Sequence, residues 1–358
     1  MTKENMHYAD YLQLDKILNA QKLESESLGR KAHDEMIFIV IHQVYELWFK
    51  QILFELGSIN ELFAQETLDD KKLGLISSRL ERVNQIFKTL VNQISIIETI
   101  TPMNFLEFRD LLSPASGFQS LQFRLLESML GITKGDRTSE ETPFFDSRLS
   151  TEEKDQLKKA LAQDSLVTNV NKWLERMPFI ETENFSFWDE YKKVVKKMLH
   201  QDQEIVLNNP TLSQSRKDEE KMKIDHMSED FFKLFDKKGN SKFSNQAVLS
   251  ALFISLYQDF PLLHLPFKIL NQMIDLDKHL TQWRQGHALM AKRMLGSKIG
   301  TGGSAGHQYL KRTAQKHTVF SDLFLVSSYL IPKNLRPKLP SQMNQNLSYH
   351  YNVSKNIL

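Results

Sequence analysis

The sequence predicts an all-α protein. Glycine and proline, which interrupt helices, number only 13 and 10 among 358 residues, whereas Leu, Lys, Glu, Gln and Met, which favour helix, are plentiful. Apolar residues recur at helical spacing in several long segments, and no alternating run flanked by turn signals indicates a strand. We therefore expect one large helical domain, with long central core helices and a more polar peripheral helical segment.

The first third of the chain divides into an arm and a core segment. Residues 1–30 form the arm, with a short helix over 15–21 and a loop at ESESLGRK. Residues 31–132 form the core segment. Four helices are expected there: an apolar one opened by Asp34 and Glu35 and running at least to Leu56, where Gly57 could bend or end it, one over 72–99, one over 104–112, and one from near Phe118 to Gly131.

The rest of the chain alternates between polar and apolar character. Residues 133–243 are charged, and we expect peripheral helices and loops that cover the core. Residues 244–340 should return to the core, with helices over 247–257, 267–295, around Tyr309 and over 320–330. Gly296 should end the second of these, because glycine commonly follows the last helical turn. An extended tail should begin at PKNLRPKLPSQ and continue through residues 341–358.

The composition excludes several classes of site. There are no cysteines, which rules out disulfides, thiolate zinc sites, cysteine-ligated iron–sulfur clusters and thiol catalysis. A net charge of +2 argues against a nucleic-acid-binding protein, which would carry a basic patch. The start, MTKENMHYAD, does not resemble a signal peptide, and no apolar run reaches the length of a membrane span. We therefore expect a cytoplasmic protein that binds neither nucleic acid nor membrane.

The run MIFIVIHQVYELWFKQILF places His42 in the middle of an apolar helix. Such a segment is too apolar for a surface helix, so it should lie in the core with His42 facing the interior. A buried imidazole needs a hydrogen bond, a metal or a ligand. A core histidine with satisfied hydrogen bonds is the simpler interpretation, and this run alone favours it.

Three pairs of side chains repeat one arrangement, with an aromatic residue four positions before a polar one: Phe38 and His42, Phe105 and Arg109, Trp283 and His287. Residues at this spacing share a helix face. If the three pairs converged, they would form an aromatic-walled pocket for a flat, partly charged ligand. Ordinary amphipathic packing would produce the same spacing.

Two arginines and one loop add to this picture. Arg109 and Arg124 lie among apolar neighbours, where a guanidinium needs a carboxylate or phosphate partner, supplied by a ligand or by a structural acid. The loop IGTGGSAG contains Thr301 and Gly302 and matches a dinucleotide fingerprint in form, but that motif requires a preceding strand. The loop could close over a ligand or simply connect two elements.

The histidines show no metal-ligand spacing to one another. The only Glu-x-x-His joins Glu4 to His7, which disfavours a di-iron site. A cofactor that brings its own equatorial ligands needs only one axial histidine. The residues therefore suggest haem in a cysteine-free, aromatic-rich helical pocket, and they go no further than that.

Four segments resemble the tryptophan 2,3-dioxygenase family: YADYLQLDKIL, HDEMIFIVIHQVYELWFKQILFEL, FRDLLSPASGFQSLQFRLLE and WRQGHALMAKRMLGSKIGTGGSAGHQYL. They occur in order between about Tyr8 and Pro340, and SSYLIPKNLRPKLP is closer to animal-type members than to shorter bacterial ones. The resemblance implies an all-helical homotetramer with one haem b per subunit. Its reaction would insert O2 across the indole C2–C3 bond of L-tryptophan, giving N-formylkynurenine in the first step of the kynurenine pathway.

The resemblance also implies roles for individual residues around the haem. His287 would be the axial iron ligand, with Trp283 packed beside it. Ser116 and Arg124 would serve the distal pocket and a haem propionate, and Gly302 would also belong to the cofactor site.

The substrate would be bound on the distal side. His42 would be the catalytic residue and hydrogen-bond to the indole N–H, while Phe38 stacks on the ring and Phe105 lines the pocket. Arg109 would bind the substrate carboxylate with the help of Thr301. Tyr8 and Tyr11 would complete the pocket of a neighbouring subunit.

Three alternatives remain. The chain could be a haem-binding sensor or inactive relative, a related indole dioxygenase with a different substrate, or a helical interaction protein without a cofactor. The presence of Arg109, Thr301 and the glycine loop together argues against the first of these.

Overall fold

The structure is a computed structural model that describes residues 6–133, 149–233, 241–296 and 318–349. Helices dominate these residues, which confirms the all-α class. The only strands in the described ranges are two short ones, β1 (Glu181–Thr182) and β2 (Phe185–Ser186), which pair antiparallel. The absence of long alternating runs is thus matched by the absence of an extended sheet in this part of the chain.

Contacts within the chain group into two units. Unit 1 contains residues 1–55, 83–163 and 278–318, and unit 2 contains residues 56–82, 164–277 and 319–358. Their boundaries fall inside three long helices: α4 (Glu35–Phe63), α5 (Asp70–Ile97) and α14 (Pro261–Leu295). Each of these helices therefore contributes a segment to both units.

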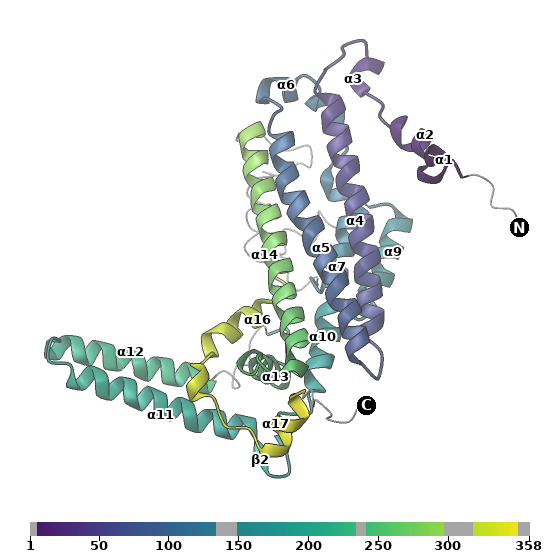
Figure 1. The fold of residues 1–358 in the computed structure, drawn as a ribbon. Coiled ribbons are helices and arrows are strands. Elements are labelled where there is room, and N and C mark those ends of the chain that lie inside the picture. The colour runs from purple at the N-terminus through teal and green to yellow at the C-terminus, as the bar shows by residue number, and fades with distance from the viewer. Residues whose placement is uncertain (1–5, 134–148, 234–240, 297–317, 350–358) are drawn as a thin grey trace, which may run out of the picture. The chain divides into compact units, whose positions relative to one another are not determined.

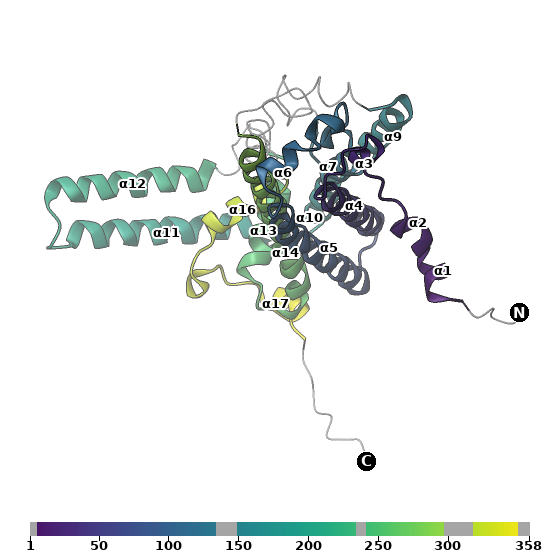
Figure 2. The same cartoon turned by 90° about the horizontal axis from the view of Figure 1, so that it is seen from above.

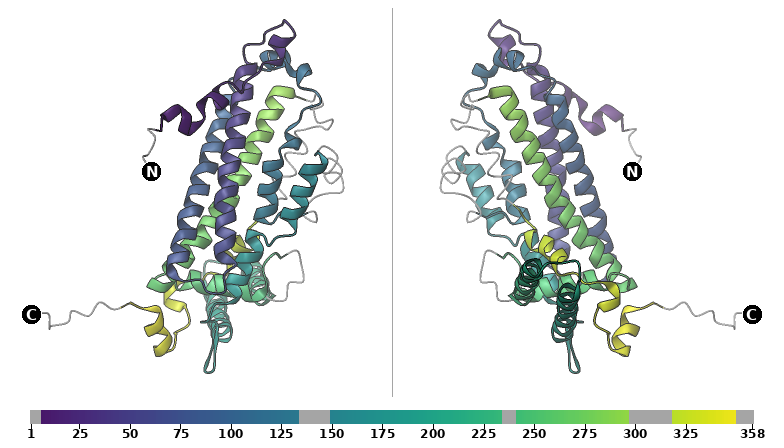
Figure 3. Two further views of the ribbon diagram at one scale, coloured as in Figure 1. Left: turned by 90° about the vertical axis from the view of Figure 1, so that its right-hand side faces the viewer. Right: turned by 90° about the vertical axis from the view of Figure 1, so that its left-hand side faces the viewer.

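In unit 1 the segments of α4, α5 and α14 run side by side (Figures 1 and 3). Most of the side chains buried on these segments are apolar, among them Ile41, Phe49, Leu90 and Ile94, and a buried hydrogen bond of 3.0 Å joins His279 of α14 to Asn84 of α5. Helix α7 (Leu121–Leu130) ends at Gly131, as expected, and packs against α9 (Thr151–Leu161) through Leu125 and Leu157. These helices form the frame on which the polar side chains of unit 1 are placed.

The N-terminal arm contains more helix than expected. Three short helices, α1 (Tyr8–Leu12), α2 (Leu14–Leu18) and α3 (Glu24–Ser27), replace the single helix and loop. Gln13 adopts a left-handed conformation, with φ of 52°, and separates the first two. Neither α1 nor α2 buries a side chain in this chain.

Helix α4 departs from the expected core helix. It continues through Gly57 to Phe63, and it leaves an apolar stripe open to solvent, formed by Met36, Val40, Leu47 and Phe54. The neighbouring helices cover only one side of α4, so its apolar composition exceeds what this chain can bury. The expectation that the whole helix is enclosed in the core is therefore wrong for the single chain.

Two elements of the described residues have the length and composition of membrane spans. Helix α4 passes that test by itself, and the bent pair of α13 (Asn245–Leu256) and α14 passes it together. We expected no apolar run of that length, and α4 reaches it although Glu46 and Lys50 interrupt its apolar residues. Core helices of water-soluble proteins also reach this hydropathy.

Unit 2 is organised around α13, whose residues are almost all buried. Helix α10 (Leu166–Glu175) packs on it, and Phe187 and Tyr191 meet its Phe253 and Tyr257 in an aromatic cluster. Helices α11 (Phe187–Asn208) and α12 (Gln214–Lys233) form an antiparallel hairpin (Figures 1 and 2). The polar middle of the chain therefore supplies core residues at α10 and at the start of α11.

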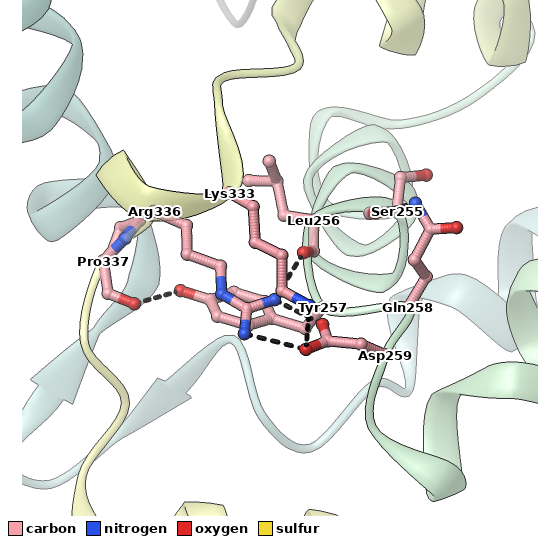
Figure 4. Close-up of polar contacts among 8 residues, drawn as sticks. All are labelled: Ser255, Leu256, Tyr257, Gln258, Asp259, Lys333, Arg336 and Pro337. Atoms are coloured by element: carbon pink, nitrogen blue, oxygen red, sulfur yellow. Dashed lines mark hydrogen bonds and ion pairs between the residues drawn. The ribbon is translucent and has the colours of Figure 1, made fainter.

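The described residues between 321 and 349 contain further helices, in contrast to the expected extended tail from PKNLRPKLPSQ onward. After α16 (Ser321–Val326), η4 (Ser327–Tyr329) and η5 (Lys333–Leu335), helix α17 (Ser341–Leu347) buries Met343 and Leu347. Arg336 anchors the segment between η5 and α17. Its guanidinium donates to the Leu256 carbonyl and to Asp259 and lies over the Tyr257 ring (Figure 4). The Tyr257 hydroxyl donates to the Pro337 carbonyl at 2.6 Å. The proline-rich composition predicted an extended tail and gave no indication of these hydrogen bonds.

Candidate active site

An aromatic cluster surrounds the beginning of α4 in unit 1. The rings of Phe38 and His42 are 4.3 Å apart between centroids, as their shared helix face predicts. Phe105 lies 5.8 Å from Phe38, so two of the three predicted pairs meet here. Phe108 contacts both phenylalanines edge-on, at 5.5 and 5.4 Å, and is fully buried. Sequence reasoning missed Phe108, although it lies within the same NFLEFRDLL segment.

Phe105 and Arg109 do not share one helix. Helix α6 (Pro102–Leu106) ends between them, and Arg109 opens the 3-10 helix η1 (Arg109–Leu112). The expected helix over 104–112 is broken because Phe108 leaves helical geometry, with φ of −125° and ψ of −5°. Phe105 and Arg109 both belong to unit 1. Arg109 is half-buried, and the adjacent Asp110 forms an ion pair with Arg30 at 2.7 Å.

The His42 imidazole has a defined hydrogen-bonding arrangement. Its Nδ1 lies 2.6 Å from the Phe38 carbonyl oxygen. A carbonyl can only accept, so Nδ1 carries the proton and Nε2 is left as an acceptor. The side chain is open to solvent, which corrects the expectation that it faces the interior. Nearby protein atoms still lower the pKa of His42 by desolvation, partly offset by the Phe38 hydrogen bond and the Glu46 charge.

His287 lies on α14, one turn after Trp283. The two rings stack with centroids 5.5 Å apart and an interplanar angle of 28°. Burial lowers the pKa of His287 to about 4, and the charge of a protonated His42 would lower it further. The two imidazoles are therefore within electrostatic range of each other. At neutral pH His287 carries a free lone pair, which a metal ligand requires.

Three aromatic residues hold Trp283 in place. Phe123 of α7 lies 5.1 Å from the indole, and Phe49 and Tyr45 of α4 meet it edge-on at 6.0 and 6.1 Å. The Tyr45 hydroxyl donates to the Leu90 carbonyl at 3.2 Å, and burial raises its pKa to about 12. Tyr45 therefore stays protonated and acts as a hydrogen-bond donor. The orientation of His287 thus depends on packing from two helices besides its own.

Arg124 is buried, as expected, and has a protein carboxylate as a partner. Its Nη1 lies 3.1 Å from Glu127 Oε2, and Arg284 of α14 lies 2.7 Å from the other oxygen. Glu127 and Arg284 were not identified from the sequence, because an acid and a base on separate helices carry no local signal of pairing. The guanidinium of Arg124 also lies 5.8 Å from the Phe118 ring.

Ser116 lies in the connection between η1 and α7. Its hydroxyl accepts from the Phe118 amide at 3.4 Å and caps η2 (Gly117–Gln119), while Gln119 bonds back to its amide at 2.8 Å. Helix α7 begins at Leu121, and Ser120 caps it. The expected helix start near Phe118 is thus a separate short turn.

The remaining predicted residues are not brought into the cluster by this chain. Tyr8 and Tyr11 lie on α1 and are 71% and 70% exposed. Thr301 and Gly302, with the whole glycine loop, lie outside the described residues. Among the described residues, no group of three or more His, Cys, Asp or Glu side chains could hold a bare metal ion.

Comparison with known proteins gives a consistent result. The family model described as tryptophan 2,3-dioxygenase matches residues 1–330. A tryptophan 2,3-dioxygenase of Bdellovibrio bacteriovorus is 45% identical over 355 residues, covering 97% of this chain and 99% of the relative. Those of Dictyostelium discoideum and Rattus norvegicus are each 41% identical, covering 98% and 94% of this chain and 90% and 85% of the relatives. The similarity extends to a bacterial relative along almost its full length, so it is not confined to animal-type proteins.

Proposed function

The chain belongs to the tryptophan 2,3-dioxygenase family, and we propose that it works with one haem b per subunit, held by His287. It is a dioxygenase, an oxidoreductase that acts on tryptophan and O2 in tryptophan breakdown. The observation that carries the proposal is the position of His287, stacked on Trp283 and within charge range of His42.

The residues present fit a haem group. The half-buried, neutral imidazole of His287 would be able to bind haem iron, and the aromatic rings around Trp283 and Phe38 suit a flat macrocycle. When bound, haem iron supplies the activation of O2.

His42 would orient the substrate. Because Nδ1 is committed to the Phe38 carbonyl, Nε2 can accept a hydrogen bond from the indole N–H. The lowered pKa keeps the ring neutral at neutral pH, so this acceptor is available. Phe38 would stack on the indole, and Phe105 and Phe108 would form the apolar wall beside it.

Charged groups would bind the amino-acid end of tryptophan. The Arg109 guanidinium is suited to a bidentate bond with a carboxylate, and Thr301 would assist it. Ser116 would face the distal pocket. Arg124 and Gly302 would belong to the haem site, with Arg124 kept rigid by Glu127.

The reaction breaks one bond of the substrate. The indole C2–C3 bond is cleaved, and each of its carbons gains one oxygen atom from O2, so that N-formylkynurenine retains both atoms. His42 would position the indole N–H in this reaction and need not remove its proton. The binding groups fix which bond meets the oxygen, because they hold both the ring and the carboxylate.

The assembly would be a homotetramer in the cytoplasm, without nucleic acid or membrane as partners. Tyr8 and Tyr11 are exposed on α1, which buries no side chain in its own chain, and α4 carries an exposed apolar stripe. Both features are suited to burial against other subunits. The arm would thereby complete a neighbouring subunit's substrate pocket.

One assay tests the activity. The purified, haem-loaded, reduced protein should convert L-tryptophan and O2 to N-formylkynurenine, followed by the absorbance of the product and by mass spectrometry. Absence of product from fully haem-loaded, reduced protein would contradict the proposal. Tryptophan binding without turnover would indicate a sensor, and turnover only of another indole would indicate a relative with a different substrate.

Two substitutions test the assigned histidines. His287→Ala should lose the haem absorbance band, because it removes the axial ligand. His42→Ala should keep the band but lose turnover by about 10²–10³-fold, as for a group that orients a substrate. Loss of haem from the His42 variant, with haem retained in the His287 variant, would show that the two roles are reversed.

A further inference from the structure

We propose that Glu46 is a positioning residue for the dioxygenase reaction: its carboxylate fastens the start of helix α7 to helix α4, one turn from His42. The inference rests on the proposed function, because it concerns the geometry of the proposed substrate site. The family resemblance gave Glu46 no role, and no pattern in the sequence distinguishes it from other acids of α4.

Glu46 makes three hydrogen bonds to the first residues around α7. The Ser120 hydroxyl donates to Oε1 at 2.6 Å, and the Gln122 amide donates to Oε2 at 2.8 Å. The same amide nitrogen also lies 2.8 Å from the Glu46 carbonyl oxygen. Both carboxylate oxygens are thus used, and the group lies at the positive end of the α7 dipole.

Ser120 serves two purposes in this arrangement. While it donates to Glu46, its oxygen accepts from the Phe123 amide at 3.2 Å and caps α7. The cap and the link to α4 are therefore the same side chain. Any displacement of Ser120 from Glu46 would disturb the first turn of α7.

The segment on either side of this link carries proposed site residues. Before it lie Arg109 in η1 and Ser116 at the start of η2. After it lies Phe123, which packs against Trp283 at 5.1 Å. Glu46 therefore fixes where the distal segment and the support of His287 lie relative to His42. The negative charge of Glu46 also raises the pKa of His42, whereas desolvation lowers it.

The substitution Glu46→Gln tests this role in the haem-loaded enzyme. Glutamine keeps the volume and one acceptor but replaces the second acceptor and the charge. We expect kcat/KM for tryptophan to fall by about 10–100-fold, with a raised KM, because small misplacements of binding groups are costly. Haem content should stay at the wild-type level, since the axial ligand lies on α14. Glu61→Gln, an exposed acid on the same helix, is the matched control and should behave as wild type.

Two further readouts separate positioning from simple stabilisation. In a His42→Ala background, Glu46→Gln should change kcat/KM by less than about twofold, because residues that act as a unit are not additive. Hydrogen exchange of the Phe118 and Phe123 amides should be about tenfold faster in Glu46→Gln, as expected when a charged hydrogen bond is lost. A spectral titration of the ferric protein should show about tenfold weaker tryptophan binding.

Three results would overturn the inference. The first is wild-type kinetics in Glu46→Gln. The second is an equal loss in the wild-type and His42→Ala backgrounds, and the third is a loss of activity that only follows a loss of haem or folding. An inactive wild-type enzyme would instead contradict the proposed function, and the exchange and tryptophan titration would then decide the role of Glu46 separately.

Discussion

Phe108 shows how one buried side chain can organise a site. It is fully buried and contacts both Phe38 and Phe105 edge-on, so it fills the volume beside both rings. Neither ring could keep its orientation if that volume were empty, because protein interiors are close-packed. Phe108 therefore fixes the orientation of its two neighbours in the proposed substrate wall.

Phe108→Ala should lower the free energy of unfolding by about 3–5 kcal/mol, the usual cost of removing a buried phenyl ring. Met103→Ala, at a position that is 73% exposed on the neighbouring helix, should change it by less than about 0.5 kcal/mol. Chemical denaturation followed by circular dichroism measures both. Equal, small effects in the two variants would show that the cluster repacks around the lost ring.

At the scale of residues, local pairs were predictable and distant ones were not. The spacing of Phe38 and His42, and of Trp283 and His287, follows from the helix repeat, and both ring contacts are confirmed. The pairing of Glu127 with Arg284 depends on how two helices meet, which no local pattern records. The roles of Arg109, Thr301, Tyr8 and Tyr11 stay predictions.

Buried carboxylates accept hydrogen bonds from backbone amides of other segments at several places in the described chain. Glu35, the first residue of α4, accepts from the backbone amides of Glu24 and Ser25 at 2.9 and 3.0 Å and also bonds the Ser25 hydroxyl. In unit 2, Asp277 accepts from the amides of Val319 and Phe320, and Asp322 from those of Lys242 and Phe243. Each acid satisfies donors that a loop cannot pair by itself.

Glu35→Gln should lower the free energy of unfolding by about 1–3 kcal/mol, because charged acceptors of buried amides contribute about that much. The loop between α3 and α4 should also become a site of limited proteolysis. Glu24→Gln, an exposed acid on α3, is the control and should leave both measurements unchanged. An unchanged cleavage pattern in Glu35→Gln would mean that the arm is held by other contacts.

At the scale of elements, helices were easier to predict than their ends. Gly296 ends α14 with φ of 60°, as expected for a glycine after the last turn. The start of α14 was predicted too late, at Phe267, whereas the helix begins at Pro261 and contains Pro266. Pro261, at the first helical position, costs little because the first amides have no partners within the helix, whereas Pro266 lies one turn later and cannot donate to the Leu262 carbonyl.

Asp259, which follows α13 in the chain, binds two cations of the segment around Arg336. Asp259 bonds to Arg336 and lies 2.9 Å from the Lys333 ammonium. These cations hold the pKa of Asp259 well below its usual value. A lowered pKa means that the charge contributes stability above the unfolded value of about 3.9, and that this contribution is lost as the pH falls below it.

Asp259→Asn should therefore destabilise the protein at neutral pH by about 1 kcal/mol, a modest amount because solvent screens this partly exposed pair. The difference from wild type should shrink steadily below about pH 4, where the wild-type carboxylate loses its advantage. Thermal unfolding across this range measures it. Asp155→Asn, an exposed acid on α9, serves as the control. A difference that is constant with pH would assign the effect to packing.

At the scale of the whole molecule, class and family were predictable, and burial was not. Composition and periodicity indicate helices in any environment, so the all-α prediction did not depend on knowing which helices meet. Whether an apolar face is covered depends on the partners that pack against it. His42 illustrates the limit: the run around it predicted an enclosed helix, and the chain leaves that side open.

Helix α4 has consequences for how this protein can change over evolutionary time. One face packs into the chain, a second presents Phe38 and His42, and a third exposes Met36, Val40, Leu47 and Phe54. Few positions along α4 can therefore accept a substitution without loss of stability or function, because each of the three faces makes its own demands on the side chain. The charged, solvent-facing surfaces of α11 and α12 carry no such burden, so sequence variation should accumulate there first.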